Sequence, residues 1–325
     1  MSAARTQKPF RFAASSAAAG SAGAWTELAR RVEGSGYSTL YVADHYVDAA
    51  SNGGQQLAAI PAIMAAAAVT TTLRVGARVL CIDYHQPVVL AKQAATIDLL
   101  SDGRFDLGLG AGWVGSEYEA MGLVMDDAPT RIARLADTVA FVRRFFAGEA
   151  LDGGTGSVAA SGFVGQPQPV QAGGPPIMIG GGARKVLTLA GQVADIVSFN
   201  FDNRAGRVGP ESVQSAAASV MEQRIAWVRD GAGDRFDRIE LEVGAYFTIV
   251  TPDTPTAQVA ADKMGEMFGM SADDMLAHPN ALIGTVDEIC DRLVERRERY
   301  GISFVTVSER NLDAFAPVVA RLAGT

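Results

Sequence analysis

The sequence predicts a (β/α)₈ TIM barrel, from a regular alternation of strand-like and helix-like segments and from a count of eight strands. A chain of 325 residues, 48% of them hydrophobic, has the usual length of such a barrel and can bury one large core. A doubly wound open sheet, built from the same alternation, is the alternative. No internal repeat or low-complexity linker divides the chain, so we expect one domain over residues 1–325.

The eight expected strands are apolar or alternating runs that are bounded by turn residues. They span residues 10–15, 38–43, 73–81, 105–110, 176–180, 195–200, 239–250 and 302–308. The active site of a (β/α)₈ barrel lies at the carboxyl ends of its strands. We therefore expect functional residues immediately after these runs.

Helical spacing of apolar residues follows each expected strand. The expected helices span residues 24–33, 60–70, 87–100, 131–146, 183–194, 212–229, 287–301 and 312–323. Pro61 and Pro87 lie in the first turns of their helices, where proline is tolerated. The Gly-, Ser-, Gln- and Pro-rich stretch 148–174 predicts a long connection, a hairpin or a flap. We expect insertions at about 149–173 and 251–285.

Charge and composition exclude several classes of partner. The net charge of −8 and the pI near 5.0 argue against nucleic acid, whose binders present a basic face. No apolar run reaches the roughly 18 residues of a membrane span, and no leader pattern opens the sequence, so we expect a cytoplasmic protein. Cys81 and Cys290 have neither disulfide nor zinc spacing, and we expect no metal site.

Two glycine-rich segments follow expected strands. FDLGLGAGW (105–113) ends the fourth strand, and Gly180, Gly181 and Gly182 end the fifth, directly before Ala183 and Arg184. Glycines let the backbone approach a flat or phosphorylated ligand closely, and the amino end of a helix attracts a phosphate. GLGAG alone is a weak signal, and it is neither a Walker motif nor a first-strand dinucleotide fingerprint.

Three ordered motifs carry a family resemblance: VADHY (42–46), the run 73–113, and PPIMIGGGARKVLTLAGQVADIVSFN (175–200). With these motifs the chain resembles the luciferase-like monooxygenase superfamily of flavin and deazaflavin barrels. Within it the chain looks most like the oxidoreductases that use coenzyme F420. The resemblance also implies a homodimer.

The resemblance implies a set of cofactor contacts. It places a non-prolyl cis peptide between Arg78 and Val79, behind the cofactor ring. It places Asp44 and His45 beside the ring and the substrate. The cofactor's side chain and phosphate would then pass these residues: Ala111, Gly112, Trp113, Gly180, Gly181, Gly182, Ala183 and Arg184.

The sequence departs from the family pattern at one place that bears on the proton donor. Sugar-phosphate dehydrogenases of this family carry Thr-Gly-Glu after strand four, where this chain reads Ala111-Gly112-Trp113, so we do not expect that activity. His45 is the best candidate donor because histidine titrates near neutral pH, and Glu117 and Tyr118 are alternatives. The structural alternative for His45 is a hydrogen-bonded pair with Asp44.

Several other residues could have either a functional or a structural role. His85 is expected to pack against or cap the helix at Pro87, and His278 has no catalytic role. Trp113 either stacks on a ligand or packs structurally. Arg184 either contacts a phosphate or is a solvated first-turn residue. The methionines Met264, Met267, Met270 and Met275 predict either a mobile apolar lid or a core helix.

Three functions remain open from the sequence. The first is an F420-dependent oxidoreductase that transfers a hydride between the deazaflavin and a small organic substrate. The second is a monooxygenase that uses reduced FMN on the same fold. The third is a cofactor-binding barrel without turnover. Substrate contacts would come from segments 46–57, 149–173 and 251–285.

Overall fold

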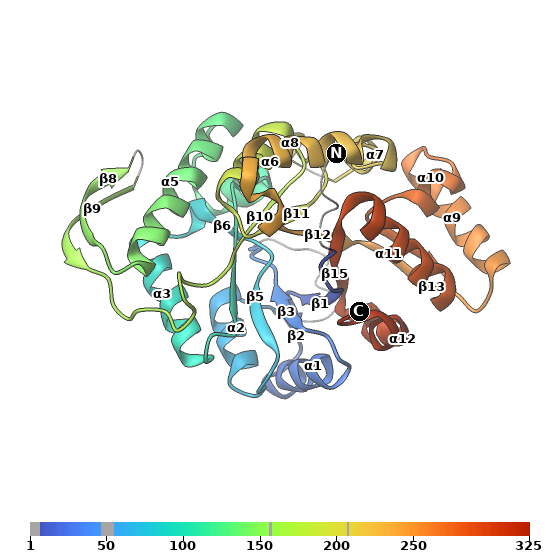
Figure 1. The fold of residues 1–325 in the computed structure, drawn as a ribbon, viewed down its shortest axis with the longest axis horizontal. Coiled ribbons are helices and arrows are strands. Elements are labelled where there is room, and N and C mark those ends of the chain that lie inside the picture. The colour runs from blue at the N-terminus through green and yellow to red at the C-terminus, as the bar shows by residue number, and fades with distance from the viewer. Residues whose placement is uncertain (1–6, 47–54, 156–157, 207) are drawn as a thin grey trace. The chain divides into compact units, whose positions relative to one another are not determined.

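The computed structural model describes residues 7–46, 55–155, 158–206 and 208–325 (Figure 1). The chain forms two compact units that interleave along the sequence. The middle unit comprises Ser16–Arg30 and Leu40–Gly180. The terminal unit comprises the residues up to Ser15, Arg31–Thr39 and Gly181–Thr325.

The middle unit is organised around strand β7. Its strands are β3 (Thr39–Val42), β5 (Arg74–Ala77), β6 (Leu80–Cys81), β7 (Phe105–Gly110) and β10 (Ile177–Gly181). Strands β5, β6 and β10 all pair in parallel with β7. Every residue of β7 is buried, as expected for a strand covered on both faces.

The described part of the middle unit has five helices, and side-chain caps help to fix where some of them start. They are α1 (Ala22–Gly34, which ends in the terminal unit), α2 (Ala59–Ala67), α3 (Pro87–Leu100), α4 (Gly115–Met121) and α5 (Ala128–Phe146), with a 3₁₀ turn η1 (Ile82–Tyr84). Helix α3 has the predicted bounds, and the Gln86 side chain caps it by accepting from the Val89 N–H. Helix α5 begins earlier than predicted because Asp127 caps it.

Two antiparallel pairs complete the middle unit. Strands β8 (Ala150–Thr155) and β9 (Val158–Val164) form a hairpin, which confirms one of the forms predicted for 148–174. Figure 1 shows this hairpin beside α5. The second pair joins β2 (Ala18–Ala19) and β4 (Gln55–Gln56).

The terminal unit has its own parallel sheet, in the order β11-β12-β15-β1. These strands are β1 (Arg11–Ser16), β11 (Ile196–Phe199), β12 (Glu240–Ala245) and β15 (Ile302–Ser308). A separate pair joins β13 (Phe247–Val250) and β14 (Ala281–Gly284) in parallel.

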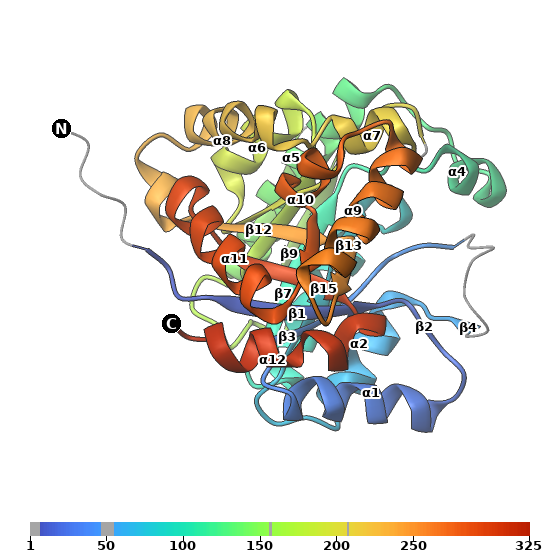
Figure 2. The same ribbon diagram turned by 90° about the vertical axis from the view of Figure 1, so that its right-hand side faces the viewer.

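Helices follow the strands of the terminal unit (Figure 2). They are α6 (Arg184–Val193), α7 (Pro210–Gln214), α8 (Ala218–Ala232), α9 (Thr254–Phe268), α10 (Ala272–Ala277), α11 (Val286–Tyr300) and α12 (Leu312–Leu322), with 3₁₀ turns η2 (Gly233–Arg238) and η3 (Glu309–Asn311). Helix α11 starts in a full capping box between Thr285 and Glu288.

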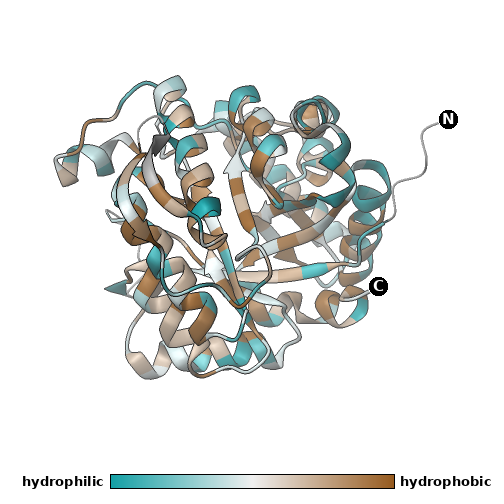
Figure 3. Cartoon of the chain, turned by 60° about the vertical axis from the view of Figure 1, so that its left-hand side comes forward, coloured by the Kyte–Doolittle hydropathy of each residue, from teal (hydrophilic) through white to brown (hydrophobic). Residues whose placement is uncertain are grey.

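The fold is a (β/α)₈ barrel, as predicted, and the open doubly wound alternative is wrong. The barrel strands β1, β3, β5, β7, β10, β11, β12 and β15 are each followed by one or more helices. Figure 3 shows apolar residues concentrated along these strands, whereas the helices carry both apolar and hydrophilic residues. Among the described residues, no helix is long and apolar enough to span a membrane.

Three predicted elements are divided in the structure. The run 73–81 forms β5 and β6, which are separated at Arg78 and Val79. The run 239–250 forms β12 and β13, with a γ-turn in which the Tyr246 N–H donates to the Gly244 carbonyl. Helix 212–229 divides into α7 and α8 through 3₁₀-type turns. Helix α4 and strand β14 were not predicted, whereas α9 and α10 lie where the methionines predicted either a lid or a core helix.

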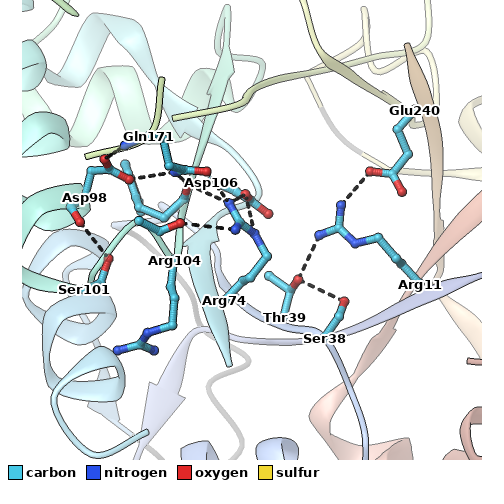
Figure 4. Close-up of polar contacts among 12 residues, drawn as sticks. Arg11, Ser38, Thr39, Arg74, Asp98, Ser101, Arg104, Asp106, Gln171 and Glu240 are labelled. Atoms are coloured by element: carbon cyan, nitrogen blue, oxygen red, sulfur yellow. Dashed lines mark hydrogen bonds and ion pairs between the residues drawn. The ribbon is translucent and has the colours of Figure 1, made fainter. Parts of the chain in front are cut away.

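Ion pairs occupy the amino ends of several strands (Figure 4). In the middle unit, Arg74 on β5 pairs with the buried Asp106 on β7 at 2.5 Å. In the terminal unit, Arg11 on β1 pairs with Glu240 on β12 at 2.6 Å and donates to the Thr39 hydroxyl. In barrels this end serves stability, so the site is sought at the opposite ends of the strands.

Candidate active site

Asp44 follows strand β3 in the middle unit and is held by two donors. Its Oδ2 accepts from the Cys81 N–H at 3.1 Å and lies 2.9 Å from His85 Nε2. Asp44 is buried, and its partners come from the segment after β5. Two structural expectations are therefore wrong: His85 pairs with Asp44 and leaves the capping of α3 to Gln86, and Asp44 is not the partner of His45.

His45 pairs with Glu117, which lies on the unpredicted helix α4. His45 Nδ1 lies 3.1 Å and 3.3 Å from the two carboxylate oxygens of Glu117. Glu117 is 1% exposed and also accepts from the Tyr46 N–H at 2.8 Å and the Tyr84 hydroxyl at 3.0 Å. His45 itself keeps 36% of its side chain exposed. Its Nε2 has no hydrogen-bond partner among the described residues.

Trp113 presents its ring to His45. The two ring centroids lie 6.1 Å apart and the planes are nearly perpendicular, at 89°. Such an edge-to-face arrangement restricts the imidazole without hydrogen bonding to it. Trp113 thus packs on the protein's own His45, which is the structural role that the sequence left open.

Buried hydroxyl, thiol and carboxyl groups form a second connected set in the middle unit. The Tyr118 hydroxyl donates to Asp83 Oδ2 at 2.8 Å and lies 3.4 Å from Cys81 Sγ. Asp83 also pairs with Arg134 on α5 at 2.6 Å. Burial raises the pKa of Cys81 to about 11, and burial is also the main cause that raises the pKa of Tyr118 and of Tyr84. These groups therefore stay protonated near neutral pH.

The peptide bond between Arg78 and Val79 is cis, as the resemblance implied. The Arg78 N–H donates to the Val42 carbonyl at 3.0 Å, which ties the segment to the end of β3. The Val79 side chain then lies against β7, beside Gly108 and Gly110.

The glycines of FDLGLGAGW make room for neighbouring parts of the protein itself. A Cβ at Gly108 would lie 1.9 Å from the Ala77 carbonyl oxygen, and one at Gly110 would lie 2.6 Å from Val79 Cγ2. Gly112 has a φ of +75°, and a Cβ there would lie 2.0 Å from the Tyr118 hydroxyl.

The loop after β7 is fixed by an arginine that the sequence did not indicate. Arg131 on α5 donates from Nε to the Ala111 carbonyl at 3.0 Å and from Nη2 to the Gly112 carbonyl at 3.4 Å. The guanidinium thereby orients two consecutive peptide groups between strand β7 and helix α4. No sequence pattern near Arg131 announces this contact, because it depends on tertiary packing.

In the terminal unit, residues 180–184 lead from β10 into α6. Gly180 and Gly181 end the strand, and a Cβ at Gly182 would lie 2.3 Å from the Phe201 carbonyl oxygen. Ala183 is the N-cap and offers no side-chain hydrogen bond, and the first turn holds no acidic residue. Arg184 is exposed at the first position of the helix. This amino end keeps free backbone N–H groups beside basic side chains.

A second polar cluster in the terminal unit is deeply buried. Arg224 on α8 is 1% exposed and donates from Nη2 to the Asn200 carbonyl. Its Nε and Nη1 have no hydrogen-bond partner among the described residues, and burial lowers its pKa to about 10. His278 Nε2 lies 3.0 Å from the Val213 carbonyl, and burial lowers the pKa of this histidine to about 4. His278 is thus a neutral core residue.

The methionine group is divided between core and surface. Met275 on α10 is fully buried, and Met264 and Met270 pack against its cluster. Met267 on α9 is 66% exposed and lines a surface cavity of about 310 Å³ together with Lys263. Most of the group therefore fits the core-helix alternative. A further cavity of about 270 Å³ in the middle unit is lined by Asp83, His85 and Arg134, among others.

No group of three or more potential metal ligands occurs in the described part of the chain. Of the segments expected to contact substrate, residues 47–54 and 156–157 lie outside the described residues. Residue Tyr46 is described, and its ring contacts Tyr84 at a centroid distance of 5.4 Å.

Comparison with known proteins identifies the family. The model of the luciferase-like monooxygenase family matches residues 7–304, so the chain belongs to this family. The F420-dependent glucose-6-phosphate dehydrogenase of Beutenbergia cavernae is 33% identical over 177 residues, which cover 53% of this chain and 50% of that protein. The 4-hydroxyprotoasukamycin monooxygenase of Streptomyces nodosus subsp. asukaensis is 34% identical over 124 residues, which cover 38% of this chain and 32% of that protein.

The chain thus spans half or less of the length of these two curated relatives. A solved F420-dependent secondary alcohol dehydrogenase, in complex with an F420-acetone adduct, shares the fold. It superposes with a TM-score of 0.75 over 97% of this chain and 99% of that chain, at 18% identity. Both F420-dependent oxidoreductases and monooxygenases therefore occur among the proteins that this chain is similar to.

Proposed function

We propose that the protein is an F420-dependent oxidoreductase that transfers a hydride between the deazaflavin and a small organic substrate. The observation that carries the proposal is His45: a partly exposed imidazole after β3, with Nδ1 on a buried carboxylate and Nε2 without a hydrogen-bond partner among the described residues. His45 is thus placed to exchange a proton with a ligand.

The terminal unit offers a donor set that suits the phosphate of such a cofactor. The amino end of α6 has no side-chain cap, no first-turn carboxylate, and the exposed Arg184 as its first residue. Backbone N–H groups, the helix dipole and a guanidinium favour an anion there. In the proposal, the phosphate contacts are Gly180, Gly181, Gly182, Ala183 and Arg184.

The middle unit would hold the ring and the substrate. In the proposal, the ring contacts are Asp44, Arg78, Val79, Ala111, Gly112 and Trp113, and His45 is the catalytic residue. When bound, the deazaflavin accepts or donates a hydride at its central ring carbon. The chain's own contribution is to orient the ring, to exclude water and to exchange a proton at His45 Nε2.

A monooxygenase that uses reduced FMN is the second candidate, favoured by the 34% identity to 4-hydroxyprotoasukamycin monooxygenase. We further propose that residues 1–325 form one domain and that the protein is a cytoplasmic homodimer. Light scattering of the purified protein tests the homodimer. A barrel that binds cofactor without turnover is the remaining alternative.

The test is a titration of the purified protein with F420 and, separately, with FMN, followed by turnover assays with a panel of alcohols and carbonyl compounds. We expect F420 binding and hydride transfer. His45→Gln should retain F420 affinity and slow turnover about 100-fold, the usual contribution of a positioned acid or base. Tyr46→Phe, which alters an exposed neighbour, is the matched control. Tight FMN binding without any response to F420 overturns the proposal, and F420 binding without turnover favours the non-catalytic barrel.

A further inference from the structure

We propose that Glu117 is the positioning residue of His45, and that it sets the imidazole tautomer so that Nε2 exchanges a proton with the oxygen of an alcohol or carbonyl substrate. This inference rests on the proposed function and narrows its substrate class. It assigns a task to helix α4, which carries Glu117.

The surroundings of Glu117 make its carboxylate an acceptor only. The Tyr46 N–H donates to it at 2.8 Å and the Tyr84 hydroxyl donates at 3.0 Å. Burial, together with the nearby Cys81 and Glu117, raises the pKa of Tyr84, so the phenol keeps its proton. A carboxylate that accepts from these donors also presents lone pairs to His45 Nδ1.

The tautomer of His45 follows from that contact. Both oxygens of Glu117 lie within 3.3 Å of Nδ1, so Nδ1 carries the proton and donates it to the carboxylate. In the neutral imidazole, Nε2 then holds a lone pair. Asp44 cannot take over the task of Glu117, because its Oδ2 is engaged by the Cys81 N–H and by His85.

This arrangement suits an oxygen-bound proton. In alcohol oxidation, the hydroxyl proton passes to Nε2, the carbon–hydrogen bond gives its hydride to the oxidised deazaflavin, and the C–O bond becomes a carbonyl. The carboxylate of Glu117 stabilises the imidazolium that forms, as a buried acid does for its histidine in other enzymes. In the reverse direction, the imidazolium returns the proton to the carbonyl oxygen as the hydride arrives at carbon.

The titratable groups near His45 come from several elements. They are Glu117 on α4, Tyr84 on η1, and Asp44 with His85, Tyr46 and Cys81 around the ends of β3 and β6. Of these groups, Glu117 hydrogen-bonds to the His45 ring. A change at Glu117 should therefore act on His45 directly.

The experiment uses the fact that the chain has only three histidines, so ¹⁵N-histidine labelling gives a readable spectrum. At pH 8, where an ordinary histidine is neutral, we expect His45 to show a protonated Nδ1 and an unprotonated Nε2. Glu117→Gln should shift His45 toward the opposite tautomer or a mixture. Glu119→Gln, on the same helix but exposed, is the matched control and should leave the spectrum unchanged.

Kinetics supply the second measurement. Glu117→Gln should lower kcat for secondary alcohols about 100-fold with little change in KM, and Glu117→Asp should recover part of the loss. The signals of His85 and His278 report whether each variant is folded. A wild-type His45 with its proton on Nε2, or a tautomer that Glu117→Gln leaves unchanged, overturns the inference. Failure of F420 to bind overturns the proposed function instead, and the tautomer measurement decides the role of Glu117 without any cofactor.

Discussion

The two units contain histidines of opposite character. In the middle unit, His45 is partly exposed and pairs with the buried carboxylate of Glu117. In the terminal unit, His278 is fully buried, and its ring hydrogen-bonds to backbone groups, the Val213 carbonyl and the Asn280 N–H. Burial lowers the pKa of His278 to about 4, so it stays neutral. Exposure and a carboxylate partner, more than residue type, separate a proton-exchanging histidine from a structural one.

Two arginines differ in the same way. Arg134 in the middle unit is partly exposed and pairs with Asp83 and Asp126, and these hydrogen bonds raise its pKa. Arg224 in the terminal unit is buried and donates to the Asn200 carbonyl, but its Nε and Nη1 have no hydrogen-bond partners among the described residues, and its pKa is lowered. Arg134 is therefore paired with two carboxylates, whereas Arg224 is a buried cation that is only partly paired. A poorly paired buried charge is costly, so substitutions of the two arginines should differ in their effect on stability.

The largest expected effect comes from glycines that lie against neighbouring backbone. Each unit has an example. Gly108→Ala places Cβ 1.9 Å from the Ala77 carbonyl oxygen, and Gly182→Ala places it 2.3 Å from the Phe201 carbonyl oxygen. Because backbone must move in both, we expect each to lose more than about 3 kcal/mol of unfolding free energy. Chemical denaturation measures this loss. Gly34→Ala, with nothing within 4 Å of its Cβ, is the control and should change stability little. A wild-type denaturation curve for Gly108→Ala would contradict the packing.

An intermediate effect is expected from the two arginines. Arg134→Met leaves the Asp83 carboxylate, whose side chain is 5% exposed, with the Tyr118 hydroxyl as its remaining side-chain donor, and should cost about 2 kcal/mol. Arg224→Met removes a buried cation that is only partly paired, and should cost less than about 1 kcal/mol or stabilise the fold. Urea denaturation of both variants measures the difference. Equal losses would show that Arg224 is as well compensated as Arg134.

From His278 we expect a pH dependence whose change within any one pH unit is smaller than the losses expected at Gly108 and Arg134. Its pKa is about 4 in the folded chain and near 6.5 when unfolded, so the unfolded state binds more protons between these values. Stability should therefore fall as the pH drops from about 6.5 toward 4, by at most about 1.4 kcal/mol per pH unit from this group.

The check is the slope of unfolding free energy against pH. His278→Gln should flatten the slope relative to wild type, even if it lowers stability overall. If His278→Gln kept the full slope, other groups would have to account for it.

Much of the fold followed from local pattern. The alternation of period-two and period-3.6 segments gave the strand–helix order, and Pro87 marked the start of α3 correctly. The divisions at Tyr246 and at Ser215 were not visible, because a continuous apolar run reads the same whether or not its register breaks. The short helix α4 was missed because its seven residues carry little periodicity.

The candidate site was likewise predicted only in part. The positions of Asp44, His45 and Trp113 after predicted strands came from the sequence, and so did the cis bond, through family resemblance. The pairing of His45 with Glu117 did not, since 71 residues lie between them in the chain. The protein atoms that lie against these glycines were not predicted either, because a sequence shows that a Cβ is missing but not which atom fills the space.

By itself, then, the sequence determined the barrel class, the places where its strands end and the residue types found there, because periodicity and turn chemistry are local. Only the tertiary structure decided which carboxylate meets which histidine, and which glycines admit neighbouring backbone. Those contacts join residues far apart along the chain, and they depend on burial and on distances of a few ångströms that no local pattern encodes.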